Sequence, residues 1–110
     1  MITPPRRRAR MAQTSFTSFS PGQRAAVERL ARRRRIPQWQ IYEEAAAALI
    51  EQREAGATIV WEASRGEGGT PHNVRMTAAT LEEIRRIAEE QELAVTTVLL
   101  TALTRYLQKP

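Results

Sequence analysis

The chain has 110 residues, of which 42% are hydrophobic and 26% are charged, and its formal net charge is +5. This length suits one compact domain or two halves that fold together, and no apolar run approaches the ~18 residues of a membrane span. Cysteine and aspartate are absent, and His72 is the single histidine. Disulfides and thiolate sites are therefore excluded, and no clustered ligands or acid–base pairs are visible. We expect a cytoplasmic protein that is not an enzyme and that uses no cofactor, metal or small-molecule substrate.

Charge is distributed unevenly along the chain. Residues 1–40 contain ten arginines and one glutamate, whereas residues 41–110 contain seven basic and eleven acidic residues. Such asymmetry indicates a basic face or arm for a polyanion, and arginine suits bidentate contacts to phosphate or guanine. The alternative is that these arginines only decorate a solvated surface. Residues 1–13 have two prolines and no hydrophobic period, so we predict a disordered basic arm that carries Arg6, Arg7, Arg8 and Arg10.

The first half of the chain predicts a short strand followed by two helices. Threonine and phenylalanine favour a strand over 14–19. Ser20-Pro-Gly-Gln is a capping-box arrangement that begins a helix running to about Arg35. Pro37 interrupts that helix and can open the next one. The second helix carries a wide apolar stripe over 41–50 and ends near Gly56, a natural left-handed residue.

The second half predicts the same order after an intervening segment over 57–72. That segment holds a β-prone run over 58–63, which makes an extra strand possible, and a glycine-rich loop over 65–69. A short strand is predicted over 72–76, and Thr77 is placed to cap a helix that runs to about Glu92, although Thr80-x-x-Glu83 offers a competing capping box one turn later. The last helix is predicted from about Val95 to Gln108. Trp39 and Trp61 are interpreted as core or interface aromatics rather than base-stacking residues.

The two halves share one burial pattern, displaced by 57 residues without a gap. Apolar positions of the first half recur at that spacing in the second, although few residues are identical; the matched pairs include Val27/Ile84, Leu30/Ile87, Ala31/Ala88, Ile41/Val98, Ala45/Ala102 and Leu49/Tyr106. Units too small to hold their own cores can bury each other. The sequence therefore predicts two units, over 14–56 and 73–110, that form one mainly α-helical fold with two short strands.

The stretch from Val74 to Leu107 resembles the ribbon-helix-helix superfamily of Arc-, MetJ- and CopG-type repressors. The resemblance covers residues 73–108 and, less closely, 15–52. It implies a two-stranded antiparallel ribbon that enters the major groove of DNA over a four-helix core. Because the pattern occurs twice, it also implies that one chain supplies both halves as an intramolecular pseudo-dimer, as in tandem TraY-like proteins.

Strand alternation then selects candidate base-reading residues. If Val74 and Met76 face the helices, Asn73 and Arg75 face the groove, where asparagine suits adenine and arginine suits guanine. When the outward positions of the second strand are mapped onto the first strand by the 57-residue displacement, they give Thr14, Phe16 and Ser18. An outward phenylalanine departs from the family, so Phe16 either touches bases or belongs to the core of a shifted strand. The alternative for Asn73 and Arg75 is an exposed, solvated ribbon.

Phosphate contacts are carried over from the same family. The resemblance places them at the start of the second helix of each unit, where free N–H groups and the helix dipole favour anions. The matching side chains are Gln38, Trp39, Thr96 and Thr97. Arg34 and Arg35, at the end of the Arg32–Arg35 run, lie next to the first of these sites in the sequence and are further candidates for phosphate contacts. Ordinary helix capping is the alternative for Gln38 and the threonines.

The leading hypothesis is a nucleoid-associated, sequence-specific binder of double-stranded DNA, acting as a transcriptional repressor or as an accessory factor of plasmid conjugation or mobile-element transfer. Self-association on DNA is a further expectation. A second hypothesis is an antitoxin-like interaction module that contacts a protein partner through residues 57–73. A third is nonspecific binding of RNA or another polyanion through the arginine-rich arm.

Overall fold

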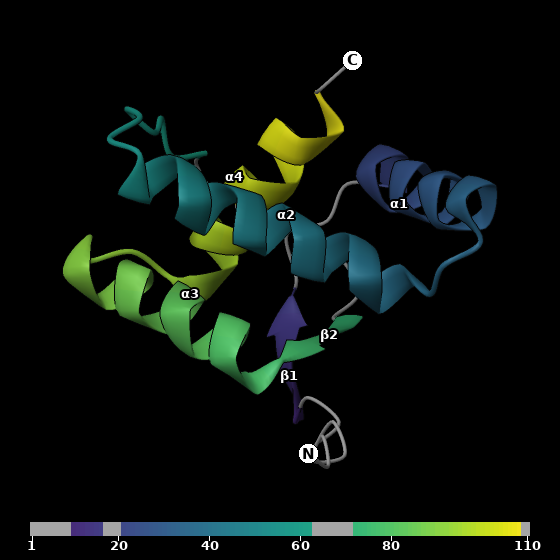
Figure 1. Ribbon diagram of the computed structural model, residues 1–110, viewed down its shortest axis with the longest axis horizontal. Helices are drawn as coiled ribbons and strands as arrows, with labels where there is room; N and C mark the ends of the chain where they lie inside the picture. The colour runs from purple at the N-terminus through teal and green to yellow at the C-terminus, as the bar shows by residue number, and fades with distance from the viewer. Residues whose placement is uncertain (1–9, 17–20, 63–71, 109–110) are drawn as a thin grey trace, which may run out of the picture.

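The computed structural model describes residues 10–16, 21–62 and 72–108. The elements follow the order β1 (Met11–Phe16), α1 (Pro21–Arg34), α2 (Gln38–Glu54), β2 (His72–Thr77), α3 (Ala78–Glu90) and α4 (Val95–Leu107). In Figure 1, α2 crosses the middle of the molecule, α1 and α3 lie towards opposite ends, and the two strands lie beside the start of α3. None of the helices in the described residues combines the length and hydropathy that crossing a bilayer requires.

The two strands form an antiparallel ribbon in which distant parts of one chain pair. Met11 lies opposite Thr77, and Thr14 lies opposite Val74. Val74 and Met76 are buried at 2% and 0% exposure. Directly opposite residues of an antiparallel pair project from the same face of a sheet. One face of the ribbon is therefore fastened to the helices, and the other is turned away from them.

The predicted boundaries of both strands differ from the structure. We predicted the first strand over 14–19, but β1 begins at Met11 and ends at Phe16, and residues 17–19 lie outside the described part. The predicted disordered arm over 1–13 is wrong for residues 11–13, which form half of β1, and residues 1–9 lie outside the described part. β2 matches its prediction and extends one residue further, to Thr77. Pairing with β2 extends the strand to residues 11–13, whose own sequence has little strand character.

The helices end where backbone chemistry predicts. α2 is followed by Gly56, whose φ of 85° confirms the predicted left-handed residue. α1 and α3 instead end on non-glycine residues in the left-handed region, Arg35 at φ 57° and Glu92 at φ 56°. In each case the next N–H closes the last turn, from Ile36 to the carbonyl of Ala31 at 3.0 Å and from Leu93 to that of Ala88 at 2.8 Å. These two terminations are 57 residues apart along the chain.

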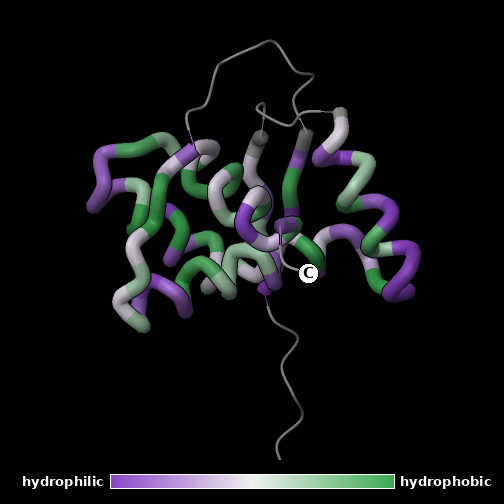
Figure 2. The backbone as a smooth tube through the Cα atoms, turned by 90° about the horizontal axis from the view of Figure 1, so that it is seen from above, coloured by the Kyte–Doolittle hydropathy of each residue, from purple (hydrophilic) through white to green (hydrophobic). Residues whose placement is uncertain are grey.

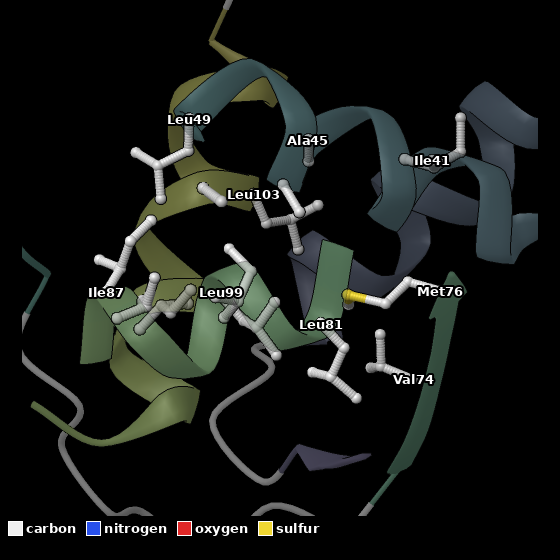
Figure 3. Close-up of a cluster of buried hydrophobic side chains, with 14 of the residues drawn as sticks. Ile41, Ala45, Leu49, Val74, Met76, Leu81, Ile87, Leu99 and Leu103 are labelled. Atoms are coloured by element: carbon white, nitrogen blue, oxygen red, sulfur yellow. The ribbon is translucent and has the colours of Figure 1, made fainter. Parts of the chain in front are cut away.

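The core is built from the apolar stripes of all four helices and from β2. The stripes predicted from the sequence are buried or half-buried, and Leu81 and Leu100 join them. Figure 3 shows side chains of α2, α3, α4 and β2 converging on one volume. Its fully enclosed large side chains are Ile41, Leu49, Met76, Leu81, Ile84, Leu103, Val27 and Val98. No unit of strand and two helices holds this core alone, because its members come from both halves of the chain.

A carboxylate from α2 holds the junction of β2 and α3. Glu43 accepts the Thr77 N–H at 2.9 Å through Oε2, and its Oε1 accepts the hydroxyls of Thr77 and Thr80 at 2.8 and 2.6 Å. Thr77 also caps α3 as predicted, since its Oγ1 accepts the Thr80 N–H at 3.4 Å. The negative charge lies where the helix dipole is positive. This contact fixes the ribbon to the central helix.

α1 occupies a different position relative to the ribbon from α3. α3 packs against both strands, whereas α1 packs against α2. Two hydrogen bonds join α1 to α4, from Gln23 Nε2 to Thr104 Oγ1 at 3.0 Å and from Arg34 Nη1 to Tyr106 Oη at 2.9 Å. The described halves are therefore alike in element order but not in packing, and α1 lies at the edge of the molecule (Figure 1).

Tyr42 makes the stability of the folded chain depend on pH in the alkaline range. Burial raises the pKa of its hydroxyl to about 12, and Glu28 adds to the increase while Arg24 opposes it. The neutral phenol is thus favoured in the folded chain, while the unfolded chain ionises near its ordinary value of about 10. Stability is then unaffected by this group below pH ~10 and falls as pH rises from ~10 towards ~12.

We expect urea titrations at pH 9 and pH 11 to show lower stability at pH 11, by roughly 1 kcal/mol after allowing for partial solvent screening. Tyr42→Phe should remove most of this pH-dependent difference. An ultraviolet titration of tyrosinate gives an independent reading, because Tyr42→Phe should remove a component whose midpoint lies well above the ordinary tyrosine pKa of about 10. An unchanged difference in the variant would contradict the assignment.

Candidate nucleic-acid interface

The outer face of the ribbon carries an exposed polar cluster. Gln13 of β1 lies directly opposite Arg75 of β2, and Asn73 lies two residues along β2 on the same face. All three are exposed, while the alternate positions Val74 and Met76 are buried. None of the three polar side chains has a hydrogen-bonding or ionic partner within the described residues. We call Gln13, Asn73 and Arg75 the ribbon face.

The ribbon face has the hydrogen-bonding groups that distinguish base pairs. Arg75 offers only donors, in the fork geometry that matches the N7 and O6 acceptors of guanine. The amides of Gln13 and Asn73 each offer a donor and an acceptor, which match adenine N7 and N6–H. A two-stranded ribbon is also narrow enough to enter the major groove.

The prediction for the first strand is wrong in its orientation. Thr14, predicted to face outwards, lies opposite buried Val74 and is itself half-buried, whereas its neighbour Gln13 is exposed. Phe16 pairs with His72, and Ser18 lies outside the described residues. The outward residues Gln13, Asn73 and Arg75 all have odd numbers, so an outward position of β1 and one of β2 differ by an even number. The displacement of 57 that relates the helices is odd, and it therefore assigns the wrong face of β1.

Gln13 was the residue missed by the sequence argument. The alternation of β1 is weak, because Ala12 and Thr14 are small and carry no strong apolar signal. The signal that identifies Gln13 lies in β2, where polar Asn73 and Arg75 alternate with apolar residues. An antiparallel pairing that places Arg75 opposite Gln13 then assigns the face of β1.

The side chains that were predicted to contact phosphate differ in how exposed they are. Thr97 has only 8% exposure, and its carbonyl accepts the Thr101 hydroxyl at 2.9 Å, so its side chain belongs to the packed layer. Thr96 and Trp39 are half-buried, and Gln38 is exposed at the first turn of α2. α2 and α4 begin without a side-chain cap, so capping does not occupy Gln38 or Thr96.

The predicted arginines also differ in what surrounds them. Arg34 donates to Glu44 Oε1 at 3.0 Å as well as to Tyr106, and the hydrogen bond to Glu44 raises the pKa of Arg34 further above its ordinary value. Arg35 is exposed next to the start of α2. Arg10 is exposed at the start of β1, where its carbonyl accepts the Ala78 N–H at 2.7 Å. Arg6, Arg7 and Arg8 lie outside the described residues.

Trp61 takes part in the fold. It is half-buried and packs against the core together with Ile59, while Val60 between them is 77% exposed. The backbone N–H of Glu62 donates to Thr101 Oγ1 at 2.9 Å, which fixes this segment beside α4. The described part of the β-prone run, residues 58–62, forms no strand. This position agrees with the interpretation of Trp61 as a core or interface aromatic.

The fold and the ribbon face define a small, mainly helical protein with a two-stranded antiparallel sheet and an exposed polar surface on it. Within the described ranges, no group of three histidine or glutamate side chains is arranged to hold a metal ion. No protein-family model, no curated protein and no solved structure matches the chain.

Proposed function

We propose that this protein binds double-stranded DNA in a sequence-dependent manner by inserting its ribbon into the major groove. The observation that carries the proposal is the ribbon face, in which Gln13, Asn73 and Arg75 are exposed together above a buried opposite face. The rigid attachment of the ribbon through Met76 and Glu43 supports it, because groups that read bases must be held in place.

The architecture supports a tandem ribbon-helix-helix interpretation of the chain. The order strand, helix, helix occurs twice. The starts of α1 and α3 and those of α2 and α4 each differ by 57 positions, as do the left-handed terminations at Arg35 and Glu92. In this interpretation one chain supplies both strands of the ribbon, and the two outer strand faces differ in sequence. The biological role would be that of a repressor or an accessory factor of DNA transfer.

Phosphate contacts would orient the ribbon in the groove. Arg10 at the entrance of β1, Arg35, and Gln38 at the uncapped start of α2 are the exposed groups available for this task. Such contacts add affinity on every DNA sequence and make it depend on salt. Arg34 would contribute less, because Glu44 and Tyr106 already bind its guanidinium group.

The deciding experiment measures fluorescence-anisotropy binding to a duplex from the region upstream of the protein's own gene and to a shuffled duplex. We expect Arg75→Ala to lower affinity for the native duplex by roughly 10- to 100-fold while changing the shuffled duplex little, because a bidentate base contact discriminates by ~1–3 kcal/mol. Arg10→Ala should weaken both duplexes alike and reduce the salt slope. Arg85→Ala, on exposed α3 surface, serves as the matched control.

Two results would contradict the proposal. One is equal affinity for both duplexes that collapses between ~50 and ~200 mM salt, which would leave nonspecific polyanion binding as the activity. The other is a native-duplex preference that survives Arg75→Ala and Asn73→Ala together, which would place sequence recognition elsewhere on the molecule.

A further inference from the structure

Exposed charges of opposite sign gather at opposite ends of the molecule. On α1, Arg29, Arg32 and Arg33 are all exposed, and their spacing of three and four residues places them on one helix face. We call these three residues the basic end. Figure 2 shows purple hydrophilic segments recurring along α1 at one side of the molecule.

The other end is acidic and is built from two helices. Arg53 and Glu90 form an ion pair at 3.6 Å, which holds the last turns of α2 and α3 together. Around this junction four glutamates are exposed, and we call them the acidic end: Glu51, Glu54, Glu89 and Glu92.

The length of α2 separates the two ends. α1 is followed closely by the first residue of α2, while the acidic end surrounds its last turn. At 1.5 Å per residue, a helix of 17 residues is about 25 Å long. Residues of the basic end therefore do not reach the acidic end of the same molecule. In Figure 1, α1 lies on the side of the molecule opposite the last turns of α2 and α3. Among the described residues, none of the seven side chains has an ion-pair partner.

We propose that these two ends bind each other between copies of this chain, with α1 of one molecule docking against the α2–α3 junction of the next. The occupant follows from charge complementarity, since three arginines match a cluster of four glutamates and neither set has an ion-pair partner among the described residues. The contact joins two different surfaces and is therefore heterologous, so its repetition builds closed rings or open rows. The overall charge of +5 opposes association, and the local complementarity must exceed that repulsion.

The proposal does not depend on DNA binding, and its test contains no DNA. Sedimentation velocity or light scattering on the purified chain should show mass above the 12.5 kDa monomer at low salt. The excess should disappear between ~20 and ~500 mM salt, because the screening length falls to a few ångströms over that range.

Charge reversal provides the decisive comparison. The double variants Arg29→Glu with Arg32→Glu, and Glu54→Arg with Glu89→Arg, should each be monomeric at low salt, because the first changes the charge of the basic end from +3 to −1 and the second changes that of the acidic end from −4 to zero. An equimolar mixture of the two should associate into pairs, since the unchanged acidic end of the first variant complements the unchanged basic end of the second. Glu82→Arg, at an exposed position outside both ends, should associate like the parent chain. Matching far-UV circular dichroism confirms that each variant is folded.

Three results would overturn the proposal: a parent chain that is monomeric at low salt, association that persists in either double variant, and a mixture that stays monomeric. Sequence-dependent DNA binding is measured separately on the ribbon face. A failure of this contact is therefore distinguishable from a failure of the proposed function.

Discussion

Replacement of Glu43 by alanine is expected to destabilise the protein by about 2–3 kcal/mol, because a carboxylate that receives three hydrogen bonds is lost at once. The Thr77 N–H and the hydroxyls of Thr77 and Thr80 all donate to it. Hydrogen bonds to a charged group are stronger than neutral ones, and the half-buried donors would be left without this acceptor. Urea unfolding followed by circular dichroism measures the change.

The neighbouring residue provides a matched control. Glu44→Ala removes a carboxylate from the same helix, but its pair with Arg34 is partly exposed, at 35% and 37% for the two side chains, and should contribute less than ~1 kcal/mol. Its Oε2 is also enclosed with no hydrogen-bonding partner in the described part of the chain, so removing it costs less still. Equal losses in the two variants would show that the Glu43 contact does not fasten the ribbon.

Met76→Ala is expected to cost about 2–5 kcal/mol, the range for emptying a buried methionine site. Met76 is fully enclosed and belongs to the inner face of β2, so it joins the ribbon to the helical core (Figure 3). Loss of this contact would also loosen the ribbon face on the opposite side. The variant should therefore lose native-duplex preference at temperatures where its helices remain folded.

Met76→Leu tests whether the apolar volume of the side chain or its thioether group is what stabilises the protein. It preserves most of the apolar volume and should cost less than ~1.5 kcal/mol. Val60→Ala, at a position with 77% exposure, should change stability by no more than ~0.5 kcal/mol. A large loss in Met76→Leu, or none in Met76→Ala, would contradict the role of Met76 as the anchor of the ribbon.

The helices could be predicted because their signals are local. Apolar residues recur every three to four positions, Pro37 stops one helix, and Gly56 follows another. β2 could be predicted for a similar reason, since Val74 and Met76 alternate with Asn73 and Arg75. These patterns depend on neighbours within one turn or one strand, and they appear in the sequence directly.

The orientation of β1 and the role of Glu43 depend on contacts between distant segments. Small residues at positions 12 and 14 give β1 no strong preference for either face, so its partner strand decides the register. Glu43 looks like any surface glutamate on a helix, yet it bonds to residues 34 and 37 positions away. Neither feature produces a periodic pattern in the sequence, so neither could be predicted from it. Both features belong to the candidate interface.

The ribbon joins two strands of one chain that are separated by residues 17–71. Its formation is consequently a loop-closure event, first order in protein, and dilution should not slow it. Closing a loop of this length costs entropy before the pairing returns any free energy. Contacts of such large sequence separation slow folding, whereas helices form early. The surface proposed to read DNA would then be among the last parts to become native, so newly made chains would acquire sequence preference only when folding is complete.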